Sequence, residues 1–86
     1  MKKNILKVHP DDNVVVALRD LLKGEEVALA GKTYIVAEDI PAKHKFTETA
    51  LVEGESIFMY GVLVGKAQAR IAAGARISTA NVKHAS

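Results

Sequence analysis

Between its bends the chain often places apolar residues with the period of two that is typical of β-strands. Ile57 and Met59 lie two residues apart, and the apolar residues from Val64 to Ile71 lie near one alternating face. The segment 33–37, Thr-Tyr-Ile-Val-Ala, is rich in residues that favour strands. The pattern therefore predicts short, half-buried strands, the first of them over residues 5–9.

A second pattern consists of an apolar residue, a glycine three positions later and another apolar residue three positions after that. The glycine can take a positive φ and end a bend, and the β-prone residues after it can begin a strand. The unequal spacing of the copies argues against a solenoid with a fixed period. We expect one type of corner, reused in a compact β fold, at Leu21-Gly24-Val27, Leu51-Gly54-Ile57 and Ile71-Gly74-Ile77.

The segment from Asp12 to Lys23 is compatible with two structures. Asp12 or Asn13 could cap a helix that Gly24 terminates. The three consecutive valines from position 14 instead favour a strand, because χ1 restriction lowers their helix propensity. We favour a strand from Asn13 to about Leu18, followed by a single helical turn.

The length of 86 residues corresponds to one domain. We therefore predict a single, mainly β domain over residues 1–86, built from short strands with one or two short helical turns. Pro10 and Pro41 fall at segment ends, where the loss of a backbone N–H donor is tolerated.

Composition excludes several classes of protein. The net charge is +2, the basic residues are scattered, and two Tyr, two Phe and no Trp leave few aromatic rings for stacking, so we expect no nucleic-acid binding. The absence of cysteine excludes disulfides and thiolate ligands and fits a cytoplasmic location. Lys7 and His9 break the apolar run of a signal peptide, and no window has the length and apolarity of a membrane span.

Three segments together resemble the altronate dehydratase family and its galactarate dehydratase relatives: Lys7-Val8-His9-Pro10-Asp11-Asp12-Asn13-Val14, Ile40-Pro41-Ala42-Lys43-His44-Lys45-Phe46 and Met59-Tyr60-Gly61-Val62-Leu63-Val64-Gly65-Lys66-Ala67. The resemblance covers nearly the whole chain and implies the family's N-terminal SAF domain, a β-clip fold. It further implies a larger catalytic region that binds a divalent metal, usually iron, and dehydrates an aldonic acid to a 2-keto-3-deoxy product. We expect no metal within the present chain.

The chain departs from the family near its end. Many members carry a His-x-His-Asn ending, whereas residues 78–81 here are Ser-Thr-Ala-Asn. Only Asn81 matches, so a metal or substrate role of those histidines does not transfer to Ser78 or Ala80.

The candidate substrate-binding residues are His44, Lys45 and Asn81. A loop with His beside Lys can hold a carboxylate or hydroxyl groups by charge-assisted hydrogen bonds, and with the resemblance it would reach a neighbouring catalytic cleft. The alternative is a solvent-exposed loop, or a His44 ring that fixes the turn locally.

Two other clusters carry weaker signals. His9 with Asp11, Asp12 and Asn13 could supply metal ligands, but turn formation is the stronger interpretation, because adjacent residues on an extended chain point apart. The glycines at 61 and 65 lack the pattern of a phosphate-binding loop and instead favour a bend or a close strand approach.

No combination of Ser, His and Asp and no carboxylate pair suggests a complete catalytic site, so we expect the isolated chain to be inactive. The first hypothesis is an accessory domain of a hydro-lyase acting on altronate or a related sugar acid such as galactarate. The second is a stand-alone small subunit that pairs with a large catalytic chain, as in sulfolactate sulfo-lyase. The third is a non-enzymatic β-clip module that binds a carbohydrate or a protein. The sequence leaves both a monomer and a homo-oligomer open.

Overall fold

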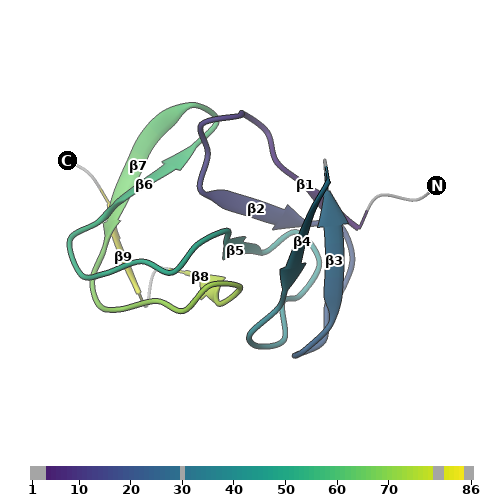
Figure 1. Cartoon of the computed structure of the whole chain (residues 1–86). Helices are drawn as coiled ribbons and strands as arrows, with labels where there is room; N and C mark the ends of the chain where they lie inside the picture. The colour runs from purple at the N-terminus through teal and green to yellow at the C-terminus, as the bar shows by residue number, and fades with distance from the viewer. Residues whose placement is uncertain (1–3, 30, 79–80, 85–86) are drawn as a thin grey trace.

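The computed structural model describes residues 4–29, 31–78 and 81–84, which form nine short antiparallel strands and no helix. They make up three sheets, shown in Figure 1. The predicted mainly β fold is confirmed. The central sheet has the order β1 (Ile5–Leu6), β2 (Val14–Ala17), β5 (Lys45–Thr47) and β8 (Arg76–Ile77).

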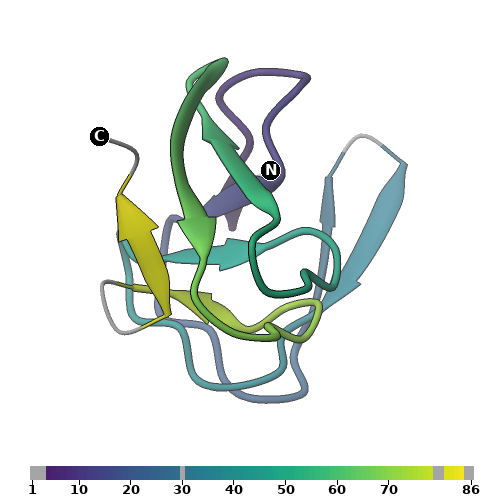
Figure 2. The same ribbon diagram turned by 90° about the vertical axis from the view of Figure 1, so that its left-hand side faces the viewer.

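Two smaller sheets lie at opposite ends of the central one (Figure 1). One is a hairpin of β3 (Glu26–Leu29) and β4 (Lys32–Ile35). The other has the order β6 (Ser56–Met59), β7 (Val62–Ala67) and β9 (Val82–His84), and Figure 2 shows β9 running beside β7. The described residues contain no helix long and apolar enough to cross a membrane.

The central sheet separates two apolar cores, because successive side chains of β2 and β5 point to opposite faces. Val15 and Phe46 belong to the core on the side of β3 and β4, while Val14 belongs to the core beneath β6 and β7. The first core contains Ile5, Val15, Ala17, Leu21, Val27, Val36, Ile40 and Phe46. The second contains Val14, Leu51, Ile57, Ala67, Ile71 and Val82.

All three glycine corners are formed as predicted. Gly24, Gly54 and Gly74 have φ values of 85°, 87° and 82°, and a strand begins two residues after each of them. In each corner the backbone N–H after the glycine bonds the carbonyl two residues before it, at 2.8 to 3.0 Å. The chain therefore turns sharply at each glycine and enters a strand directly.

The structure adds a fourth corner at Ile40, Lys43 and Phe46, with Lys43 in the place of the glycine at φ 73°. The His44 N–H bonds the Pro41 carbonyl at 3.0 Å, the same turn as in the glycine corners. A search for glycine overlooks this corner, because a lysine rarely adopts a positive φ.

The four corners associate in two pairs. A β-bridge joins Leu21 to Ile40, and a second joins Leu51 to Ile71. Gly54 follows Gly24 by thirty residues, and Gly74 follows Lys43 by a similar interval. The fold therefore consists of two similar halves, and β5 ends the first half and begins the second. The corner spacing is unequal because corners within one half and corners in successive halves are separated by different intervals.

The helical turn predicted after Leu18 is wrong. Leu21 exchanges two backbone hydrogen bonds of 2.8 Å with Ile40, which requires extended backbone at Leu21. The predicted strand in this segment is confirmed over Val14–Ala17. The predicted first strand is shorter than expected, because a turn at His9 to Asp12 follows soon after Leu6.

Candidate functional site

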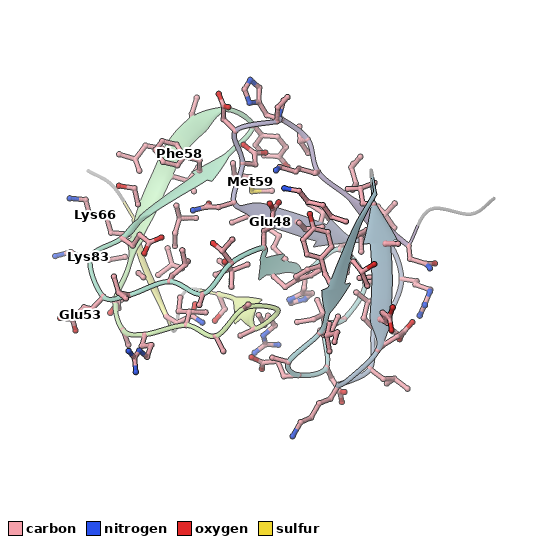
Figure 3. All side chains as sticks on the ribbon, viewed as in Figure 1. Glu48, Glu53, Phe58, Met59, Lys66 and Lys83 are labelled. Carbon is pink, nitrogen blue, oxygen red and sulfur yellow. The ribbon has the colours of Figure 1, made fainter. Side chains whose placement is uncertain are left out.

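A pocket of about 430 Å³ lies between the central sheet and the sheet of β6, β7 and β9. Figure 3 shows Met59 and Phe58 leaving β6 on opposite sides, with Met59 toward β2. A bulge in β7 leaves Val64 without a partner on β6, and Val64 lines the pocket. The described lining residues are Val14, Lys45, Ile57, Met59, Val64, Ile77, Ser78 and Val82.

Lys45 is the charged residue among the described lining residues. It lies on β5 between Val16 and Ile77, and strand alternation sends it away from the buried Phe46. The side chain is half-buried and makes no ion pair or hydrogen bond with the described part of the chain. A half-buried ammonium beside apolar walls attracts an anionic ligand, because burial weakens its hydration.

His44 does not join Lys45 in the pocket lining. Its backbone is fixed by bonds to Pro41 and Ala17, and its side chain is exposed. The two neighbours separate because consecutive side chains of an extended chain point to opposite faces.

Asn81 is not among the described residues that line the pocket, and both ends of its amide make local hydrogen bonds. Its Nδ2 donates to the Arg76 carbonyl at 2.8 Å, and its Oδ1 accepts from the Ser78 N–H at 2.9 Å. These bonds hold the connection from β8 to β9, and so position Ser78 and Val82 in the lining. Ala80 lies outside the described residues.

The carboxylate of Asp12 binds backbone amides. One oxygen accepts from Tyr60 and His9 at 2.9 and 3.1 Å, and the other accepts from Gly61 at 2.9 Å. His9 Nδ1 accepts from the N–H of Asp11 at 3.1 Å. In the described part of the chain no three His, Cys, Asp or Glu side chains converge as metal ligands. The hydrogen bonds of His9 and Asp12 support the interpretation of this cluster as a turn.

A family model described as the altronate/galactarate dehydratase SAF domain matches residues 3–85. The chain belongs to this family. The mainly β fold is consistent with that membership.

Two curated relatives are altronate dehydratases. The chain is 38% identical over 78 residues to the Escherichia coli (strain K12) protein, which covers 91% of the chain and 16% of that relative. It is 38% identical over 81 residues to the Bacillus subtilis (strain 168) protein, covering 94% of the chain and 16% of that relative. The chain thus spans about a sixth of the length of either relative.

In the SAF domain, Asp12 and Asn13 form a clamp on the β6–β7 hairpin that the sequence did not indicate. Asn13 donates to the Ser56 carbonyl at 3.0 Å and accepts from the Phe58 N–H at 2.9 Å. The sequence indicates Asp12 and Asn13 as turn formers, and Asp12 does form a turn by accepting the His9 N–H. Their long-range partners leave no local signal in the sequence.

The SAF domain also contains a polar cluster around Glu48 that the sequence did not indicate. Glu48 Oε2 lies 2.9 Å from Lys7 Nζ in an ion pair without hydrogen-bond alignment, and Oε1 lies 3.6 Å from Lys32 Nζ. Burial, the Glu48 charge and a hydrogen bond to Glu48 raise the pKa of Tyr34, and Lys7 opposes them. Lys7, Lys32 and Tyr34 line a second pocket of about 390 Å³.

Proposed function

We propose that this chain is the N-terminal accessory domain of a metal-dependent hydro-lyase that dehydrates D-altronate, or a related sugar acid such as galactarate, to a 2-keto-3-deoxy acid. Family membership and two altronate dehydratase relatives support the class of enzyme. The observation that carries the proposal for this chain is the position of Lys45. Its ammonium lines a pocket between two sheets and has no ion-pair or hydrogen-bond partner among the described residues.

In this dehydration a proton leaves C2, hydroxide leaves C3, and the resulting enol becomes the 2-keto-3-deoxy acid with loss of one water. Lys45 would hold the substrate carboxylate, and the apolar walls would keep water away from it. Asn81 would act by positioning Ser78 and Val82, since its amide is already hydrogen-bonded. The proton transfers require groups of the catalytic region.

The resemblance implies a divalent metal, usually iron, and we propose that the catalytic region holds it. A cytoplasmic enzyme fits this proposal. The catalytic body could lie on the same chain or on a separate large chain of the sulfolactate sulfo-lyase type. The role of the domain is the same in both arrangements, and co-expression with each candidate partner distinguishes them.

A chimera tests the proposal. The matching residues of the Escherichia coli altronate dehydratase are replaced by this chain, and formation of the 2-keto-3-deoxy acid from D-altronate is measured. We expect dehydration to persist, and Lys45→Met to lower kcat/KM about tenfold or more, as for the loss of a charged substrate contact. Lys66→Met, on an exposed side chain, is the matched control.

The chimera also separates His44 from Lys45. His44→Ala should lower kcat/KM less than Lys45→Met, because the imidazole is exposed and outside the described pocket lining. A stable, folded chimera without altronate dehydration would contradict the proposed function. Equal effects of Lys45→Met and Lys66→Met would remove Lys45 from it.

A further inference from the structure

The Lys45 pocket has the size of a small-molecule site but few polar groups. Its volume of about 430 Å³ lies within the usual range of ligand pockets, roughly 300 to 1,000 Å³. Its described lining contains one ammonium, from Lys45, and one hydroxyl, from Ser78, among aliphatic side chains and one thioether. Such a site recognises one charged group and an apolar segment next to it.

The charged group of the ligand must be an anion. Lys7 and Lys32 face the Glu48 carboxylate, whereas Lys45 has no such partner in the described residues. A carboxylate placed at Lys45 Nζ would make the charge-assisted hydrogen bonds that no described residue of the chain supplies to this ammonium.

The carbon atoms next to that carboxylate would lie against Ile57, Met59 and Val64. A hydroxyl donor placed there would lose its bonds to water without gaining a partner from these side chains. A methylene or a ketone loses less, since the methylene has no polar atom and the ketone has no donor. The walls therefore disfavour a carboxylate whose C2 and C3 both carry hydroxyls.

We propose that this pocket holds the carboxyl end of a 2-keto-3-deoxy acid in preference to the corresponding 2,3-dihydroxy acid. This inference rests on the proposed function, because the preferred ligand has the chemistry of that reaction's product. Dehydration converts the C2 carbinol to a ketone and C3 to a methylene, the two changes that the apolar walls favour. The domain would then bind the acid more tightly after water has left than before.

Two small acids that differ by one water test this preference on the 86-residue chain. They are 2-oxobutanoate and 2,3-dihydroxybutanoate, which have the same charge and number of carbons. In titrations followed by ¹⁵N and methyl NMR, 2-oxobutanoate should bind at least tenfold more tightly, about 1.4 kcal/mol. It should shift the signals of Val14, Val64 and Ile77. Equal affinities, tighter binding of the dihydroxy acid, or no shifts with either acid would overturn the proposal.

Two further comparisons test the parts of the pocket. Lys45→Met should weaken 2-oxobutanoate at least tenfold, while Lys66→Met, on an exposed side chain, should leave it unchanged. Butan-2-one, which lacks the carboxylate, should not bind the native chain measurably, and this comparison holds even if Lys45→Met fails to fold. Retained affinity in a folded Lys45→Met variant, or butan-2-one binding as tightly as the keto acid, would contradict the role of the ammonium.

The walls are tested by Val64→Thr, which keeps the shape of the side chain and adds a hydroxyl inside the pocket. It should reduce the preference for the keto acid several-fold, and an unchanged preference counts against the apolar walls as its cause. These titrations need no catalytic region. A failure of the preference therefore leaves the chimera result standing, and an inactive chimera leaves the preference standing.

Discussion

A single carboxylate oxygen of Asp12 accepts the backbone N–H of Tyr60 at 2.9 Å, although the two residues lie 48 positions apart. The other oxygen accepts from Gly61 at the same distance. Asp12 is 3% exposed, so these bonds are largely shielded from water. They anchor the tip of the β6–β7 hairpin, which carries Met59 and Val64 to the Lys45 pocket.

Asp12→Ala should lower the free energy of unfolding by about 2 to 4 kcal/mol, because it leaves buried N–H groups without an acceptor. Asp12→Asn should cost less, since it keeps one acceptor oxygen. Urea unfolding measures both changes. Asp11→Ala is the control, because the Asp11 side chain is 84% exposed, and its effect should stay within about 0.5 kcal/mol. Equal losses in the Asp11 and Asp12 alanine variants would refute the clamp.

Gly74→Ala should be more damaging than Gly54→Ala. Both glycines have a positive φ, but a Cβ at Gly74 would lie 2.1 Å from the Ile35 carbonyl oxygen, whereas Gly54 faces open space. The expected losses of unfolding free energy are about 3 kcal/mol or more at Gly74 and about 1 to 2 kcal/mol at Gly54. Thermal and denaturant unfolding compare the two variants, and similar losses would show that the close approach does not exist.

Lys43→Gly should stabilise the domain. Lys43 has φ 73° in a corner whose three counterparts are glycines. Glycine relieves about 1 to 2 kcal/mol of left-handed strain and loses about 0.5 to 1 kcal/mol of entropy, so the net gain is about 0.5 to 1 kcal/mol. Lys23 lies one residue before Gly24 in the first corner and has no positive φ to relieve. Lys23→Gly should therefore destabilise the domain by about 0.5 to 1 kcal/mol. A lower melting temperature for Lys43→Gly would contradict the fourth corner.

The Tyr34 phenol should titrate above its ordinary pKa of 10.0, because burial and Glu48 disfavour the phenolate. The unfolded chain then releases this proton first as the pH rises, so the contribution of Tyr34 to stability is present below pH 10 and is lost as the pH rises through the folded pKa. The difference in absorbance at 295 nm between the native chain and Tyr34→Phe isolates this titration. Glu48→Gln should move its midpoint back toward the ordinary value, and an unchanged midpoint would exclude Glu48 as a cause.

The strands and three of the four corners could be predicted because their signals are local. Period-two patterning identified Ile57 and Met59, which are both buried, and glycine marked the bends. The helical turn after Leu18 failed for the opposite reason. The backbone at Leu21 is held extended by Ile40, a partner that no local propensity reveals.

The candidate site was predictable only in part. His44 and Lys45 formed one candidate in the sequence, and the backbone of β5 places Lys45 alone in the pocket lining. Asn81 was selected for its match to the family, and the structure assigns its amide to the β8–β9 connection. Their contacts with substrate remain predictions for the chimera.

The sequence by itself determined the β class, the glycine corners, the choice of Lys45 as a candidate and the family, because propensity, alternation and motif order are properties of neighbouring residues. The tertiary structure decided which residues meet: Asp12 with Tyr60, Glu48 with Lys7, and Lys45 with the walls of β6 and β7. These contacts depend on the pairing of the two corner sets across the shared β5 strand, and such long-range pairing is fixed only when the whole chain packs.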